Sequence, residues 1–448
     1  MKKTQWRSIF SVITAFTVLA SGAAQATDLM TAYKQAKESS PLIAQAEAHW
    51  QAEQFNNNIA RSALAPRLTA AGSVSQNNLD LTGFGSTTID ETYNPSSYSV
   101  TLTQPLINGS AWSALQASRS KTKSVEAKLL AVQQDLILQT ADAYFAILRS
   151  EALERTVLSR QTLLQKISGR AEHEHQAGAG DIIAVEETHA RLDGVLAECL
   201  SARNRVQLAR RTLERLTHQP ADGLVDLNTL EPQGPIPDRI VDWVQSAENN
   251  QPALEQARQE LQASRYRIAA ASRGRWPVLS LNAQYSRADG SFSPAIDRNE
   301  SFIGVSVAWP LFQGGEVRAS RSRAEALVRA SQYGLETLED NVRLDTQRAF
   351  LNLENSAARL TATRRALKSS STALKATQKG YDIGARSVVE VLNSEQRYAN
   401  ADSEYNIALY NQLLARLQLK ASAGVLSEND VSAINDLLTP ITESGSEQ

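Results

Sequence analysis

Histidine and cysteine, which often bind metals or act as nucleophiles, are scarce in this sequence, with five histidines and one cysteine. His173 and His175 stand beside Glu172 and Glu174. Positions i and i+2 of a helix point to different sides, so we expect no metal site there. The single cysteine, Cys199, is interpreted as a small apolar helix residue. The chain carries no nucleophile elbow, P-loop or dinucleotide fingerprint, and we expect neither an enzyme nor a cofactor.

Charged and polar side chains gather instead near two glycine-rich breaks. One break contains Gly178 and Gly180, and the other contains Gly380 and Gly384. Arg386 and Glu390 follow the second break at a spacing of four, which favours a local ion pair worth a few tenths of a kcal/mol. The four glycines are candidate hinges.

The elements that hold these breaks are very long helices. No proline occurs from Leu311 to Thr439, which permits helices of unusual length. A helix from Glu316 to Lys379 would be about 95 Å long, and a second from Ser387 to Ala423 would return along it. A leucine recurs every seven residues, as in a coiled-coil seam, at Leu353, Leu360, Leu367 and Leu374. The sequence therefore predicts a rod whose tip lies at Tyr381 to Asn393.

The chain repeats itself at a nearly constant offset of about 205–211 residues, which indicates a duplicated architecture. The matching pairs are Pro41 with Pro252, Pro66 with Pro277, Pro105 with Pro310, Phe145 with Phe350, and Gly178 with Gly384. Each copy begins with a helix, Leu29 to Leu64 or Pro252 to Arg275. Two strands, a long helix, a glycine tip and a return helix follow in the same order.

Four strands are predicted from alternating polar and apolar residues. They span Arg67 to Gln76, Ser97 to Gln104, Val278 to Arg287 and Ser301 to Trp309, and the polar loops Asn77 to Pro95 and Ala288 to Glu300 join them. Their length of about 8–10 residues is near that of strands that cross a bilayer. Tyr98, Trp276 and Trp309 fall at strand ends, where an interfacial aromatic girdle would lie. An ordinary half-buried sheet would show the same alternation.

If these strands span a membrane, several chains must share them. Four strands are too few to close a barrel, and an open sheet edge is not tolerated in lipid. Three chains would supply twelve. We therefore expect a mainly α fold with a membrane β-barrel part, in which duplicated helical hairpins form a trimeric α-barrel below a twelve-stranded barrel.

The domain boundaries follow from the repeat and from the termini. Lys2, Lys3, an apolar run and Ala24-Gln25-Ala26 predict a signal peptide over residues 1–26. The first structural repeat and its linker span 27–239, the second repeat spans 240–438, and 439–448 is expected to be a disordered tail. The net charge of −2 suggests no nucleic-acid partner.

Taken together, these features resemble the TolC family of outer-membrane channel-tunnel proteins. The resemblance rests on the duplication and on four segments: Gln104-Pro105-Leu106, Ala141 to Leu148, Trp309 to Gly315, and Gly380 to Asn393. It implies a homotrimer in outer-membrane lipid, with a helical tunnel extending into the periplasm. A periplasmic adaptor protein and an inner-membrane transporter would dock at the closed inner end.

The resemblance also implies roles at the tip. Tyr381 and Arg386 match family residues that hold the tunnel shut, but their usual Thr-Asp partners align with Ile183 and Ala184. Asp181, earlier in the chain, is a candidate substitute. Glu390 and Asn393 match two constriction aspartates, so a trimer would have one ring of three carboxylates, which favours cations.

The implied function is that of a passive exit duct for type I protein secretion, serving an ABC exporter through the adaptor. Two alternatives remain open: the outer component of a multidrug efflux pump, with drugs as cargo, and a periplasmic coiled-coil structural protein or adhesin. The sequence names neither the cargo nor the exporter.

Overall fold

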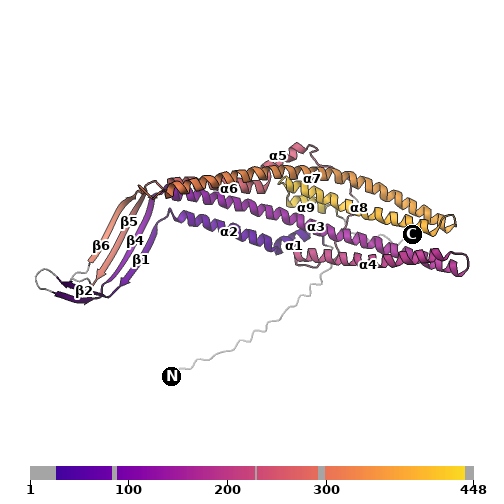
Figure 1. The fold of residues 1–448 in the computed structure, drawn as a ribbon, viewed down its shortest axis with the longest axis horizontal. Helices are drawn as coiled ribbons and strands as arrows, with labels where there is room; N and C mark the ends of the chain where they lie inside the picture. The colour runs from indigo at the N-terminus through magenta and orange to yellow at the C-terminus, as the bar shows by residue number, and fades with distance from the viewer. Residues whose placement is uncertain (1–26, 83–87, 228–229, 291–297, 439–448) are drawn as a thin grey trace, which may run out of the picture.

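The computed structural model describes residues 27–82, 88–227, 230–290 and 298–438. The expected signal peptide, 1–26, and the expected tail, 439–448, lie outside the described residues. The described chain is an elongated rod with a β-sheet at one end and two helical hairpin tips at the other (Figure 1).

Two long hairpins form most of the rod. The first consists of α3 (Gly109–Gln176) and α4 (Ile182–Thr217), and the second of α7 (Glu316–Asp382) and α8 (Val388–Ser422). With 68 and 67 residues, α3 and α7 are each about 100 Å long. Neither contains a proline, and alanine, leucine and arginine, which favour helix, are abundant in both.

Shorter helices lie beside the hairpins, and one expectation about them is wrong. The single helix expected from Leu29 to Leu64 is broken at Ser40 into α1 (Leu29–Ser39) and α2 (Pro41–Ser62). The Ser40 hydroxyl accepts a hydrogen bond from the Ile43 amide at 3.4 Å, and Pro41 opens the next helix. Serine as N-cap followed by proline is a helix-start pattern, and it restarts the helix here.

The second half of the chain has the same break. Helix α5 (Ile240–Asn250) has Gln251 as its C-cap, and α6 (Pro252–Arg273) starts with a proline directly after it. A last helix, α9 (Glu428–Asn435), follows α8 and packs against α1. No described helix is long and apolar enough to cross a membrane.

The main sheet has four antiparallel strands in the order β1-β4-β5-β6. These are β1 (Arg67–Val74), β4 (Ser96–Ile107), β5 (Val278–Asp289) and β6 (Arg298–Ala308). Strand β4 of the first half pairs with β5 of the second, from Ser96 opposite Asp289 to Ile107 opposite Leu279. Within the described residues, the outer edges of β1 and β6 have no strand partner, so the sheet stays open.

The segment expected as a polar loop, Asn77 to Pro95, contains a small antiparallel hairpin. Its strands are β2 (Asn77–Thr82) and β3 (Thr88–Tyr93). The Thr92 hydroxyl donates to the Asn78 side chain at 3.1 Å across the pair. The polar composition suggested a loop, but the alternation of leucine with polar residues also fits a strand. In the second half, β5 and β6 extend into the loop expected from Ala288 to Glu300.

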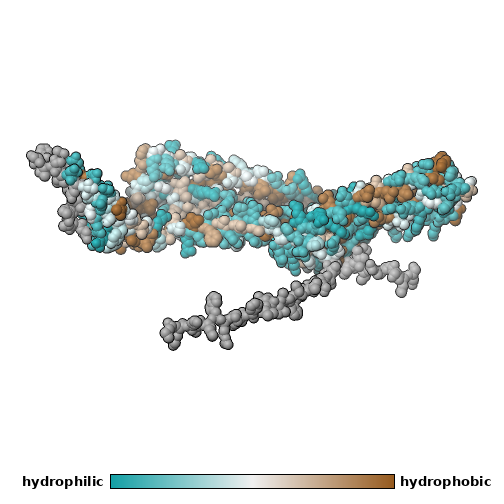
Figure 2. Space-filling model, turned by 90° about the horizontal axis from the view of Figure 1, so that it is seen from below, coloured by the Kyte–Doolittle hydropathy of each residue, from teal (hydrophilic) through white to brown (hydrophobic). Residues whose placement is uncertain are grey.

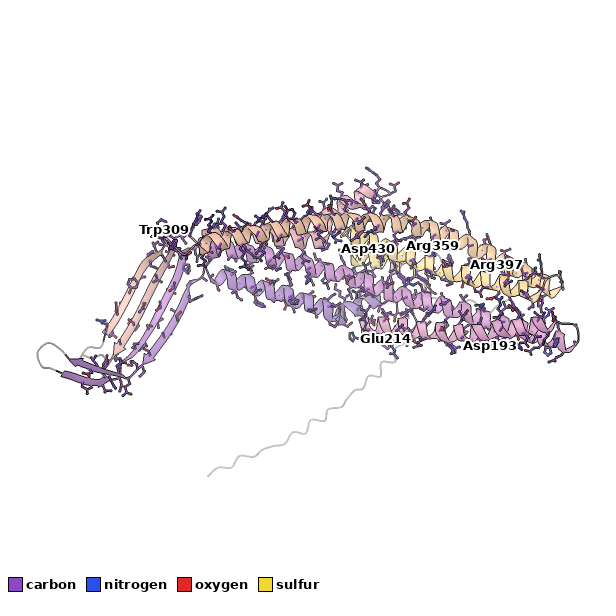
Figure 3. The ribbon with its side chains drawn as sticks, in the orientation of Figure 1. Asp193, Glu214, Trp309, Arg359, Arg397 and Asp430 are labelled. Carbon is purple, nitrogen blue, oxygen red and sulfur yellow. The ribbon has the colours of Figure 1, made fainter. Side chains whose placement is uncertain are left out.

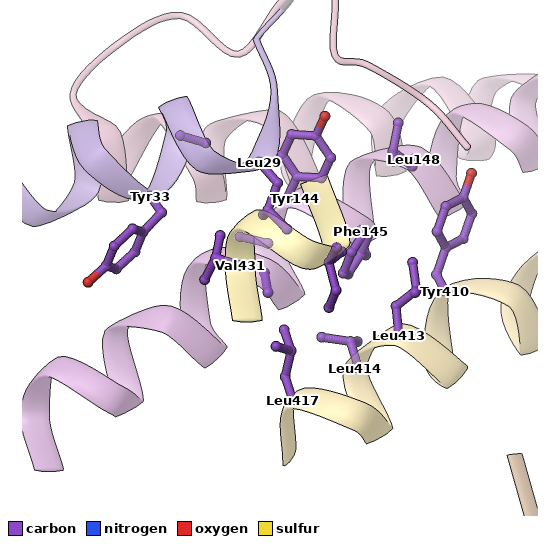
Figure 4. Close-up of a cluster of buried hydrophobic side chains, with 14 of the residues drawn as sticks. Leu29, Tyr33, Tyr144, Phe145, Leu148, Tyr410, Leu413, Leu414, Leu417 and Val431 are labelled. Atoms are coloured by element: carbon purple, nitrogen blue, oxygen red, sulfur yellow. The ribbon is translucent and has the colours of Figure 1, made fainter. Parts of the chain in front are cut away.

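The largest apolar core lies where α1, α3, α8 and α9 meet (Figure 4). Phe145 packs against Tyr410 with ring centroids 5.9 Å apart. The buried Tyr144 hydroxyl donates to the Val225 carbonyl at 2.7 Å, which satisfies its polar atom. The core therefore ties both hairpins and both ends of the described chain together at mid-length.

Aromatic side chains mark the junction between sheet and helices. Trp309 lies there, just after β6 (Figure 3), and its indole N–H donates to the Arg275 carbonyl at 3.2 Å. Trp276 precedes β5, and the Arg273 guanidinium carbon lies 5.2 Å from its ring centroid. These two tryptophan contacts stabilise the turns that join the helices to the strands.

Candidate functional site

The two hairpin tips have the same turn geometry. Gly178 and Gly384 have φ values of 72° and 73°, a left-handed conformation that glycine adopts without a side-chain clash. The amide of Ala179 donates to the Glu174 carbonyl at 2.9 Å, and that of Ala385 to the Gly380 carbonyl at 2.8 Å. Both candidate hinge pairs therefore lie in helix-ending turns.

Tyr381 contacts the other hairpin of the same chain. The Arg170 guanidinium carbon of α3 lies 4.4 Å from the Tyr381 ring centroid, a cation–π contact. Arg170 also pairs with Glu174 at 2.7 Å and with Asp382 at 3.0 Å. These partners were missed by the sequence analysis, because Arg170 is about two hundred residues from Tyr381. Burial raises the pKa of the Tyr381 hydroxyl, so it is a hydrogen-bond donor at neutral pH.

Arg386 forms the local ion pair that its spacing favours. Its guanidinium lies 2.7 Å from the Glu390 carboxylate, four residues later on the same helix. Glu390 also accepts a hydrogen bond from the Ser387 amide at 2.8 Å, which completes a capping box at the start of α8. The Ser387 amide first, and Arg386 second, lower the pKa of the exposed Glu390 side chain.

Asp181 caps the other return helix. Its carboxylate accepts from the Ile183 amide at 3.1 Å at the first turn of α4. Within this chain Arg386 therefore pairs with Glu390, while Asp181 is engaged at its own helix.

Asn393 has a partner from the first hairpin. Its side-chain oxygen accepts from the Arg191 guanidinium at 3.3 Å, and Arg191 also pairs with Glu187 at 3.0 Å. Glu390 and Asn393 lie one turn apart on α8; Glu390 is partly exposed and Asn393 is exposed. The guanidinium groups of Arg386 and Arg191 thus lie beside the two candidate constriction residues. The contact of Arg191 was not predicted from the sequence.

The histidines near the first tip are arranged for hydrogen bonding. His189 of α4 lies 2.6 Å from the Glu172 carboxylate of α3, and the hydrogen bond to Glu172 raises the His189 pKa. His175 contacts the Gly180 carbonyl at 3.1 Å. In the described part of the chain, no group of three or more histidine, cysteine or acidic side chains is placed to hold a metal ion.

The tips also expose apolar side chains. Ile183 is 67% exposed and Ile383 is 80% exposed. Figure 2 shows hydrophobic surface at the tip end of the rod.

Comparison with known proteins identifies the class to which this architecture belongs. The family model described as "Outer membrane efflux protein" matches residues 32–218 and 243–425. The match covers most of the chain, and the chain belongs to this family.

Among the relatives, "Outer membrane protein TolC" of Escherichia coli is 29% identical over 94% of this chain and 86% of its own length. "Alkaline protease secretion protein AprF" of Pseudomonas aeruginosa is 26% identical, over 94% of this chain and 89% of its own length. The solved CmeC outer membrane channel of Campylobacter jejuni has the same fold, with a TM-score of 0.79, 15% identity and 99% of each chain covered.

The chain is accordingly an outer-membrane channel of the TolC family that extends into the periplasm. The expected fold class, duplicated long hairpins joined to strands of a membrane barrel, is confirmed by these structures. Channels of this family are passive conduits and not enzymes. The alternative of a coiled-coil structural protein or adhesin does not agree with this membership.

Proposed function

We propose that three copies of this chain form the outer-membrane exit duct of a type I protein secretion system. The observation that carries the proposal is the open four-stranded sheet at the end of helices about 100 Å long. Within the described part of the chain its two edges have no strand partner, and in lipid they need neighbours because nothing there satisfies free backbone groups. Three such sheets supply the twelve strands of one closed barrel, and the helices continue it as a tunnel.

Secretion is favoured by the names of two relatives. AprF is called an alkaline protease secretion protein, and PrtF of Dickeya chrysanthemi is called a proteases secretion protein. On this proposal a periplasmic adaptor docks on the exposed tip residues Ile183 and Ile383, and an inner-membrane ABC exporter supplies the energy. The family description, which specifies efflux, favours a second candidate: the outer component of a multidrug efflux pump.

The tips act as the gate in this proposal. Gly178, Gly180, Gly380 and Gly384 are the hinges, and Tyr381, Arg386, Glu390, Asn393 and Asp181 line or hold the constriction. The support is their placement: both turns end long helices at the same end of the rod, and Tyr381 already bridges the two hairpins through Arg170. Opening then requires the α7–α8 hairpin to move relative to α3 and α4.

Conductance of the purified protein in planar bilayers tests the duct. We expect ion-conducting trimers, and a monomer in mild detergent without conductance would end the proposal. Asp181→Ala and Arg386→Ala are expected to raise single-channel conductance, and Glu390→Gln to lower cation selectivity. Deletion of the gene separates the two candidates: loss of a secreted protein supports type I secretion, and loss of drug resistance alone supports efflux.

A further inference from the structure

A row of polar contacts joins the two hairpins on the tip side of the main core. Helices α3 and α8 run antiparallel there, and side chains meet in register along the seam. The contacts are Arg149 with Asn411, Thr156 with Asp402, and Arg160 with Glu395 and Gln396. The seam therefore connects a helix of the first hairpin to a helix of the second.

Arg160 is the centre of this row. Its Nε donates to the Glu395 carboxylate at 2.9 Å, and its Nη1 donates to the Glu198 carboxylate at 2.8 Å. Glu198 lies on α4, so one guanidinium links three helices of both hairpins. Its fork of donors has the geometry to hold two carboxylates at fixed angles.

The Arg160–Glu395 pair is withdrawn from solvent. Arg160 is 8% exposed and Glu395 is 3% exposed. Burial raises the pKa of Glu395, and the nearby Arg160 opposes that shift. A buried ion pair contributes little net stability compared with apolar residues of similar size. A register or switching role is the best-attested use of such pairs, so stability alone does not account for this one.

The surroundings of the pair differ on its two sides. Toward the tips, α3 and α8 share an apolar cluster that includes Leu164, Ile167, Val391 and Leu392. Apolar contacts are non-directional and permit sliding, whereas the ion pair permits one register.

Beside the pair is an open cavity of about 340 Å³, lined by polar side chains that include Ser159, Tyr398 and Asp402. Glu395 lines this cavity, so solvent is close at hand if it leaves Arg160.

We propose that the Arg160–Glu395 pair is a conformational latch that fixes the register of α8 against α3 and α4. Release of Glu395 from Arg160 is a step in the movement of the α7–α8 hairpin, so this inference rests on the proposed function. While the pair is intact, only the part of the hairpin on the tip side of Arg160 is free to move. The main core, around Phe145 and Tyr410, stays in place.

Replacement of both partners tests the latch. Arg160→Met with Glu395→Leu keeps the volume and leaves no unpaired buried charge, so the double variant is expected to fold. We expect a several-fold rise in hydrogen exchange of the α8 amides from Val388 to Asn400, and a larger single-channel conductance. Exchange and conductance equal to those of the unaltered protein would overturn the latch.

An exposed pair that also involves α8 is the matched control. Arg359 of α7 and Glu404 of α8 lie 2.5 Å apart within one hairpin, and both side chains are more than half exposed. Arg359→Met with Glu404→Leu should leave exchange and conductance unchanged. If the buried double variant fails to form trimers, the same two measurements are made on Glu395→Gln. This variant removes the charge but keeps a hydrogen-bond acceptor.

The two proposals fail in different ways. An unaltered protein that conducts no ions would end the duct, while hydrogen exchange of α8 would still report on the latch. An unaltered protein that conducts, together with a double variant that matches it in both measurements, would end the latch alone.

Discussion

The two hairpin tips have the same turn geometry, but a second glycine follows the turn in the first tip and precedes it in the second. In the first tip, Glu174 carries a side chain and Gly180 does not. In the second tip, the equivalent positions are Gly380 and Arg386, so the side chain has changed sides. A Cβ added at Gly180 would lie 2.8 Å from the His175 amide nitrogen, and one added at Gly380 would lie 2.7 Å from the Arg386 Cγ.

The atoms that an added Cβ would meet differ between the two tips, and so does the ease with which they can move. The obstacle at Gly180 is backbone, which cannot move without opening the turn. At Gly380 the obstacle is the Cγ of Arg386, which moves only with a change of the Arg386 χ1 angle. The first tip is therefore fixed by its backbone, whereas the second depends on the position of Arg386 and its ion pair with Glu390.

The largest expected effect comes from adding one methyl group to each tip. Gly180→Ala should destabilise the first turn by about 1–3 kcal/mol, the usual cost of overpacking. Gly380→Ala should cost less than about 1 kcal/mol, because alanine favours helix and Arg386 can move. Hydrogen exchange of the tip amides measures both. Equal protection losses in the two tips would contradict the comparison.

Alanine at the left-handed glycines should affect both tips alike. Gly178→Ala and Gly384→Ala each impose a positive φ on a residue with a Cβ, at a cost of about 1–2 kcal/mol. Neither site has a neighbour within 4 Å to add a second cost. Gly169→Ala, in the interior of α3, is the control and should stabilise slightly. Hydrogen exchange of the turn amides measures both effects. If one tip loses much more protection than the other, the two turns do not have equal geometry.

Removal of the helix caps should separate the tips by a smaller amount. Asp181→Ala removes the side-chain cap of α4 and should cost about 1 kcal/mol. Ser387→Ala should cost less, since Glu390 keeps its bond to the residue 387 amide at the start of α8. Exchange of the first-turn amides of α4 and α8 gives the comparison, and a larger loss in α8 would refute it.

The smallest effect is a dependence on pH that only the first hairpin should show. His189 and Glu172 correspond in the repeat to Glu395 and Gln378, so the second hairpin lacks the histidine. Because Glu172 raises the His189 pKa, the stabilisation is complete below the ordinary histidine value of about 6.5. It is lost as pH rises through the raised pKa, while the lowered pKa of Glu172 keeps that carboxylate charged.

Exchange of the α3–α4 hairpin is therefore expected to increase as the pH rises above about 6.5, beyond the intrinsic change that α7–α8 reports. His189→Gln should remove the difference between the hairpins. A difference that survives this substitution would assign the effect to another group.

The sequence predicted the long elements well, because regular spacing determines them locally. The helix expected to end at Lys379 ends at Asp382, and the strand expected over Ser97 to Gln104 spans β4 from Ser96 to Ile107. The break at Ser40 was missed although its N-cap and proline are local signals, because the apolar pattern continues across it. The β2–β3 hairpin was missed because its composition is polar.

The contacts of the candidate site also fall into two kinds, those within one helix and those between helices. The Arg386–Glu390 pair is local, and its spacing predicted it. Arg170, Arg191, Arg160 and Glu395 meet partners on other helices, and no sequence spacing specifies which helix faces which. Such contacts depend on the packing of two hairpins about two hundred residues apart, so a single sequence does not reveal them.

The pairing of β4 with β5 has a consequence for how the protein is made. Nearly two hundred residues separate Ser99 from its partner Ser286, so β4 leaves the ribosome long before β5 exists. Such distant pairings form slowly and leave a strand edge prone to aggregation. Strand β4 therefore stays without this partner until the second half of the message has been translated.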